Sequence, residues 1–211
     1  IFRTVGLIPE ETRAARLEIA RQTSRFAQRL GVRRLCAHFG RLPERPAASA
    51  NAALVAAVRD LCDEFATRGQ VLAMETGMET SARMRRFLQA VDRPNLRVNF
   101  DPANMLLFGQ DRPMNALAIL APWIDGAHCK DGRWPVDPRF LGIETRLGEG
   151  DVDFVRCLRN LLDRGYRGPL IIETGVQGDQ LVPDLRRAKS LIEQTLASMT
   201  NLGPRSAEAV P

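Results

Sequence analysis

Short, continuously apolar runs alternate along this chain with longer amphipathic stretches, and this alternation limits the fold more than any other feature. The run Val71-Leu72-Ala73-Met74 contains no polar residue, as is typical of a strand buried on both faces of a sheet. The stretch 10–30 instead repeats its apolar residues near a period of 3.6, and Gly31 ends it, which indicates a helix. Repeated strand–helix units predict parallel strands joined by right-handed crossovers.

The pattern contains six such units. We expect strands over 1–8, 32–39, 71–74, 96–100, 124–129 and 170–172, and helices over 10–30, 49–68, 80–91, 114–120, 152–164 and 181–198. A closed (β/α)8 barrel typically needs about 250 residues. For 211 residues we therefore predict an α/β fold, a (β/α)8 TIM barrel that lacks its first two units. A doubly wound open sheet is the alternative, but no glycine-rich phosphate loop follows any strand.

Composition and charge exclude several classes of protein. With 45% apolar and 26% charged residues, the chain is typical of a globular protein with one core. We assign the barrel to residues 1–200 and a flexible C-terminal tail to 201–211. The net charge is +5, but the basic residues are scattered along helical faces, so no nucleic-acid partner is expected. No apolar run approaches the roughly 18 residues of a membrane span, so no membrane partner is expected either.

Cysteine spacing bears on the cellular compartment. Cys36, Cys62, Cys129 and Cys157 form no CxxC pair, which argues against zinc-ribbon and thioredoxin-type sites. We expect small buried residues in a protein of the reducing cytoplasm. No signal peptide is visible, although a chain that opens on Ile1 rather than Met leaves a preceding signal peptide open.

Polar residues stand at the ends of the predicted strands. They are His38, Glu75, Asp101, His128 and Glu173, each of which can bind a metal or move a proton. In a parallel barrel the carboxyl ends of the strands face one mouth, where residues distant in sequence converge. A carboxylate placed after an apolar run is costly to desolvate alone, and a shared cation removes that cost. We therefore predict one divalent-metal site made by Glu75, Asp101, His128 and Glu173.

Two of these strand ends repeat each other. Met74-Glu75-Thr76-Gly77 and Ile172-Glu173-Thr174-Gly175 share Glu-Thr-Gly, which would place two glutamates on roughly opposite sides of the mouth. Such a pair suits proton transfer in which one glutamate removes a proton from carbon and the other returns one, while a metal stabilises the enediolate. Taken singly, a glutamate at a strand end is more often a helix cap or surface residue, and His38 more often a hydrogen-bonded histidine than a ligand.

Lys130 is unusual because the chain has only two lysines among its 30 basic residues. It stands two residues after His128, where Lys130 and Arg133 could bind a substrate oxygen or phosphate or polarise a carbonyl. The alternative is an ion pair between Lys130 and Asp131. For Glu149 and Asp151 two interpretations stay open, a substrate loop or a turn with Asp151 as the N-cap of the next helix.

At these residues the sequence resembles the xylose isomerase-like TIM-barrel superfamily, in particular its sugar phosphate isomerase/epimerase branch. The similarity rests on Met74–Gly77, Asn99–Asn104, His128–Asp131, Gly148–Asp153 and Ile172-Glu173. It implies that Glu75, Asp101, His128 and Glu173 are the metal ligands and that Glu75 and Glu173 are the acid/base pair. It also implies substrate contacts at His38 and Lys130. We also expect Asn104 to contact the substrate. It stands where many epimerases carry a histidine, so neither a second metal nor an imidazole contact to substrate is implied there.

The resemblance implies a metal-dependent isomerase or epimerase of a small sugar, sugar phosphate or polyol ketone. An inosose-type dehydratase, a lyase on the same site, is the closest alternative. A non-catalytic sugar-binding module is a second, and DNA repair of the endonuclease IV type is disfavoured because its three zinc ions need more than two histidines. We expect Mn²⁺ or Mg²⁺ before Co²⁺ or Zn²⁺ for an oxygen-rich site with one imidazole. The expected partner is a small carbohydrate, and homo-oligomerisation is left open.

Overall fold

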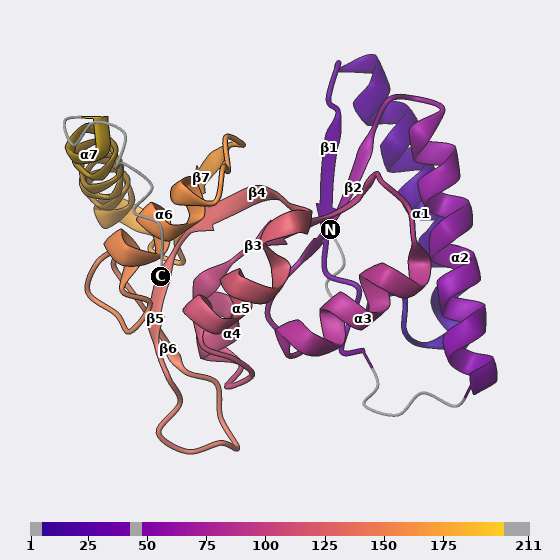
Figure 1. Ribbon diagram of the computed structural model, residues 1–211, viewed down its shortest axis with the longest axis horizontal. Helices are drawn as coiled ribbons and strands as arrows, with labels where there is room; N and C mark the ends of the chain where they lie inside the picture. The colour runs from indigo at the N-terminus through magenta and orange to yellow at the C-terminus, as the bar shows by residue number, and fades with distance from the viewer. Residues whose placement is uncertain (1–5, 43–47, 201–211) are drawn as a thin grey trace, which may run out of the picture.

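A parallel sheet forms the centre of the molecule in the computed structural model, which describes residues 6–42 and 48–200. Its strand order is β1-β2-β3-β4-β7, and every neighbouring pair is parallel. The strands are β1 (Arg34–Ala37), β2 (Val71–Glu75), β3 (Leu96–Phe100), β4 (Ile124–Cys129) and β7 (Leu170–Ile172). The sheet curls into a half-barrel, with β1 at one edge and β7 at the other (Figure 1).

Helices connect successive strands of the sheet, as parallel pairing requires, and α1 precedes β1. The longer ones are α1 (Glu10–Arg29), α2 (Ala48–Ala66), α3 (Ser81–Val91), α6 (Phe154–Asp163) and α7 (Leu181–Thr200), and the shorter ones are α4 (Pro102–Leu107), α5 (Pro113–Leu120), η1 (Ala121–Trp123) and η2 (Gly178–Gln180). In Figure 1, α1 and α2 stand beside β1, whereas α6 and α7 stand at the β7 end. Among the described helices, none is both long and apolar enough to cross a membrane.

The core lies between the sheet and these helices. Val58, Cys62, Val91, Val98 and Leu117 are fully buried, and they come from three helices and a strand. Burying a side chain of the size of valine or leucine stabilises a fold by about 1.5–3 kcal/mol. The continuously apolar strands are explained by this packing, since β2 is buried over Leu72–Met74.

The expected first strand falls mainly on residues 1–5, outside the described part of the chain. The part that is described, Gly6–Ile8, contains no strand. Gly6 has a φ of 59°, which interrupts an extended backbone, and a side chain there would collide with the main chain of Phe39. The Leu7 amide donates to the Phe39 carbonyl at 2.7 Å, so this segment is tied to the loop after β1. The predicted tail over 201–211 also lies outside the described residues.

An antiparallel hairpin that the apolar pattern does not predict follows β4. Its strands are β5 (Asp131–Arg133) and β6 (Ile143–Thr145), paired from Asp131 with Thr145 to Arg133 with Ile143. The expectation that Asp151 caps the following helix is wrong, because α6 begins at Phe154 with Asp153 at the N-cap position. The Asp151 carboxylate instead accepts a hydrogen bond from the Trp134 amide at 3.0 Å, and so belongs to the hairpin.

Candidate metal centre

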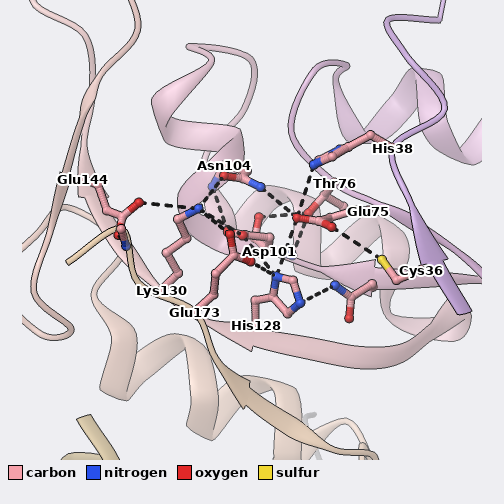
Figure 2. Close-up of polar contacts among 12 residues, drawn as sticks. Cys36, His38, Glu75, Thr76, Asp101, Asn104, His128, Lys130, Glu144 and Glu173 are labelled. Carbon is pink, nitrogen blue, oxygen red and sulfur yellow. Dashed lines mark hydrogen bonds and ion pairs between the residues drawn. The ribbon is translucent and has the colours of Figure 1, made fainter. Parts of the chain in front are cut away.

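Four side chains meet at the carboxyl ends of the strands, and we call them the four-ligand cluster: Glu75, Asp101, His128 and Glu173. Glu75 is the last residue of β2, Asp101 follows β3, His128 lies near the end of β4 and Glu173 follows β7. One potential ligand atom from each lies within 4.8 Å of the others (Figure 2). Four strands that are adjacent in the sheet thus bring together residues that span about a hundred positions of sequence.

His128 Nδ1 is the shared neighbour of the three carboxylates. It lies 2.5 Å from Glu173 Oε2, 3.4 Å from Asp101 Oδ2 and 3.6 Å from Glu75 Oε1. The other ring nitrogen, Nε2, lies 2.9 Å from the amide nitrogen of Asn99. Asn99 thus fixes the orientation of the ring and directs Nδ1 toward the carboxylates, as outer partners of metal-binding histidines do.

Asp101 is held by the backbone and side chains around it. Its side chain is fully buried, and its Oδ1 accepts the Asn104 amide hydrogen at 2.8 Å, which caps α4. The Thr76 hydroxyl accepts from the Asp101 amide and donates to the Asp101 carbonyl, both at 2.8 Å. These contacts leave Oδ2 directed at the four-ligand cluster. A buried carboxylate that directs one oxygen at a shared site is consistent with a bound cation.

The close contacts shift the pKa values of the cluster in opposite directions. The pKa of Glu173 falls to about 2, because His128 hydrogen-bonds to it and Lys130 adds a second positive partner that outweighs burial. Burial opposes a charge on His128, yet the hydrogen bonds to Asp101 and Glu173 and the nearby Glu75 raise its pKa to about 10. Burial also opposes the charge on Glu75, but His38 and His128 lower its pKa overall. The Glu75 and Glu173 carboxylates are therefore ionised at neutral pH.

Lys130, Asn104 and His38 surround the cluster. Lys130 Nζ donates to Glu173 Oε1 at 2.9 Å and to Asn104 Oδ1 at 3.2 Å. Asn104 Nδ2 in turn donates to Glu75 Oε1 at 3.0 Å, and His38 Nε2 lies 3.4 Å from the same oxygen. The hydrogen bond to Glu75 raises the pKa of His38 against the effect of burial. These three predicted substrate contacts lie within reach of a ligand bound at the cluster.

The donor set fits a hard divalent cation. It offers three carboxylates and one imidazole, and the carboxylates converge although like charges repel. His128 and Lys130 offset part of that charge in the absence of an ion. That these residues bind a metal stays a prediction.

For three further residues the sequence left more than one role open. They are Arg133, Glu149 and Asp131, and each is paired with a group outside the four-ligand cluster. Arg133 is exposed and its guanidinium donates to the Glu149 carbonyl at 3.4 Å, so a substrate contact there stays a prediction. Glu149 itself pairs with Arg187 at 2.5 Å on the surface. The ion pair between Lys130 and Asp131 is not formed, because Asp131 is occupied by backbone amides. It accepts hydrogen bonds from Gly132, Gly148, Gly150 and Val152 at 2.8–3.2 Å.

Sequence reasoning missed Asn99, Thr76 and Glu144. Asn99 is a polar residue inside the buried strand β3, and Thr76 directly follows the predicted ligand Glu75, so each offered a signal. Glu144 lies in β6, and its Oε2 is 3.6 Å from Lys130 Nζ. The sequence did contain a signal for Glu144, a third copy of the Glu-Thr pair found at Glu75 and Glu173. Ile143-Glu144-Thr145 has the same three residues as Ile172-Glu173-Thr174.

Solved structures with this fold are numerous, and two illustrate the range. A xylose isomerase domain protein from Planctomyces limnophilus is 39% identical with a TM-score of 0.86, and the match covers 94% of this chain and 71% of that one. A xylose isomerase-like TIM barrel protein from Mycobacterium smegmatis, solved in complex with magnesium, is 20% identical with a TM-score of 0.74 and coverages of 92% and 70%. The second similarity shows the fold alone.

Curated relatives match as well. The rhizopine catabolism protein MocC of Rhizobium meliloti is 34% identical over 140 residues, which are 59% of this chain and 42% of that protein. The L-ribulose-5-phosphate 3-epimerase UlaE of Salmonella paratyphi B is 26% identical over 92% of this chain and 68% of its own length. The chain thus spans less than half of the first relative and about two thirds of the second. A family model described as xylose isomerase-like TIM barrel matches residues 2–201, and the chain therefore belongs to that family.

Proposed function

We propose that this protein is a metal-dependent isomerase or epimerase of a small sugar, sugar phosphate or polyol ketone. The observation that carries the proposal is the placement of Glu75 and Glu173 at one four-ligand cluster, from strands β2 and β7 that are separated in the sheet by β3 and β4. Two carboxylates that reach one point from two directions can exchange a proton with either face of a substrate carbon. The similarity to an L-ribulose-5-phosphate 3-epimerase over 92% of the chain supports the same reaction class.

Glu75, Asp101, His128 and Glu173 would hold the ion, for which we propose Mn²⁺ or Mg²⁺. A bound divalent ion supplies a Lewis acid that polarises the substrate carbonyl and stabilises enediolate charge. The low pKa values of Glu75 and Glu173 keep both carboxylates ionised, so one can take the proton from carbon. If the glutamate that took the proton returns it to the adjacent carbon, the product is an isomer. Epimerisation needs a proton on the opposite face of the same carbon, and the partner glutamate can deliver one after taking it from water.

The surrounding residues would bind and orient the sugar. Lys130 presents an ammonium donor beside Glu173, and Asn104 presents an amide beside Glu75. His38, whose side chain is 40% exposed, adds a donor on the β1 side of the cluster. We propose contacts of these groups with substrate oxygens. Asn104 provides a neutral amide where many epimerases carry a histidine, so it can orient a hydroxyl without exchanging protons at neutral pH.

Solvent isotope exchange tests the proposal directly. Purified protein supplied with Mn²⁺ is incubated in D₂O with a panel of ketoses, ketose phosphates and inososes, and substrates are followed by NMR and mass spectrometry. Deuterium at the carbon next to a carbonyl, together with an epimer or isomer, is the expected result. Exchange followed by loss of water would identify the dehydratase instead. No exchange with any member of the panel would contradict enzyme function and favour a sugar-binding module.

A further inference from the structure

Lys130 places a positive charge next to a site proposed for a positive ion. Its Nζ lies 2.9 Å from Glu173 Oε1, and Glu173 is a member of the four-ligand cluster. It also lies 4.0 Å from Asp101 Oδ2, another member. An ammonium held this close competes with a divalent cation for the same oxygens, and its charge repels the cation. A further acidic partner for Lys130, besides Glu173 and Asp101, would reduce both the competition for these oxygens and the repulsion of the cation.

Glu144 is placed to be that partner. It projects from the β5–β6 hairpin and reaches Lys130 from the side away from His128 (Figure 2). Its Oε2 lies 3.6 Å from Lys130 Nζ, and its side chain is 28% exposed. Its Oε1 accepts the hydrogen bond of the Gly175 amide, two residues after Glu173. One oxygen is thus fixed by the backbone of the loop that carries Glu173, which leaves the other directed at Lys130.

We propose that Glu144 is a positioning residue that shares the Lys130 ammonium with Glu173 and so leaves the Glu173 carboxylate available to the divalent ion. The inference rests on the proposed metal-dependent function. Glu144 acts through Lys130, so its effect disappears when Lys130 loses its charge. In the absence of Glu144, Lys130 pairs with Glu173 alone and binding of the ion weakens.

Mn²⁺ titration calorimetry on the full chain tests this without an activity assay. Glu144→Gln keeps an oxygen for the Gly175 amide but removes the charge, and we expect it to weaken Mn²⁺ binding about tenfold, as loss of an outer-shell partner does. Glu144→Ala, which also removes the backbone contact, checks that the charge is the main contributor. In a Lys130→Met background we expect Glu144→Gln to change affinity less than twofold. Thermal unfolding of each variant confirms that it is folded.

The matched control is Glu149→Gln, since Glu149 pairs with Arg187 on the surface and has no contact with the cluster. It removes the same charge, and we expect unchanged Mn²⁺ affinity. If Glu144→Gln binds Mn²⁺ as tightly as the wild type, the inference is overturned. It is also overturned if Glu144→Gln lowers Mn²⁺ affinity equally with and without Lys130. Either result would leave the proposed metal site unaffected. If the Mn²⁺ affinities change as expected but the protein exchanges no substrate hydrogen with D₂O, the role of Glu144 is supported and the proposed reaction is refuted. Failure of the wild type to bind Mn²⁺ would refute both.

Discussion

In the proposed metal site, His128 would determine how ion binding responds to pH, because its imidazole carries a proton that an ion at Nδ1 would displace. Nδ1, the nitrogen closest to all three carboxylates, is also the nitrogen placed to bind the ion. Its pKa of about 10 is far above the ordinary 6.5, so the imidazole is charged at neutral pH before an ion binds. Lys130 stays charged as well, because Asp101 and Glu173 raise its pKa despite burial.

We therefore expect Mn²⁺ affinity to rise with pH. A raised pKa means that the protonated imidazole is favoured below about 10, so each bound ion releases one proton between pH 6 and 8. The association constant should increase about tenfold per pH unit, since Glu173, with a pKa of about 2, adds no further proton. Calorimetry at three pH values in two buffers of different ionisation enthalpy measures both quantities. His128→Ala should bind weakly, without this slope, and a pH-independent wild type would contradict the assignment.

Glu173→Gln separates proton transfer from metal binding. The amide keeps an oxygen for the ion but cannot accept a proton from carbon. Substrate hydrogen exchange should fall by about 10²–10⁴-fold, the usual contribution of a general base. Bound metal, measured by elemental analysis after gel filtration, should be reduced but present. Exchange within a factor of ten of the wild type, with metal retained, would show that Glu173 is a ligand only.

The cluster was predictable at this scale because each member directly ends, or nearly ends, an apolar strand. A carboxylate after Val71–Met74 or after Ile171-Ile172 has to leave the core at the sheet edge, and parallel strands share that edge. Glu144 was not predictable in this way, since the strand that carries it is only three residues long and its isoleucine, Ile143, is 72% exposed. Sequence periodicity reports burial, and the strand that carries Glu144, β6, contains no buried residue.

At the scale of elements, the hairpin is organised by one buried carboxylate. Asp131 is 1% exposed and accepts backbone hydrogen bonds from the loop that joins β6 to α6. This loop includes Gly150, where a side chain would collide with Asp131. The same contacts explain why α6 begins at Phe154 rather than at the predicted Val152. Its preceding residues are held by Asp131 and Trp134 instead of the helix.

Asp131→Ala should therefore destabilise the whole domain. It would leave several amides of a partly buried loop without their acceptor, at about 2–4 kcal/mol in the free energy of unfolding. Urea denaturation followed by circular dichroism measures the loss. Asp137→Ala is the control, because Asp137 bonds to Arg139 within the exposed turn of the same hairpin and should leave the midpoint unchanged. Equal midpoints for both variants would show that the loop does not depend on Asp131.

The molecule as a whole is a sheet with two unpaired edges among the described strands. β1 pairs only with β2, and β7 pairs only with β4. An ion pair between Arg34 and Asp125, at 2.6 Å, joins the β1 edge to the start of β4 and supports the curvature of the sheet. Beside β1, helix α1 and the residues after it expose apolar side chains: Ile19, Phe26, Leu30 and Val32. The period of α1 predicted the buried face that carries Leu17, Ser24 and Ala27, but not the exposure of Ile19 and Phe26 among the charged residues of the outer face.

Unpaired strand edges beside exposed apolar surface favour association between chains. We expect this 211-residue chain to self-associate above the 23.5 kDa of one copy at micromolar concentration, as measured by sedimentation velocity. Phe26 and Leu30 are one helical turn apart and are 62% and 63% exposed, so Phe26→Glu with Leu30→Glu should shift the distribution toward the monomer. Gln28→Glu, an exposed change on the other side of the same helix, should not. A wild-type chain that sediments as a monomer at every concentration, or variants that associate as it does, would show that this surface does not drive assembly.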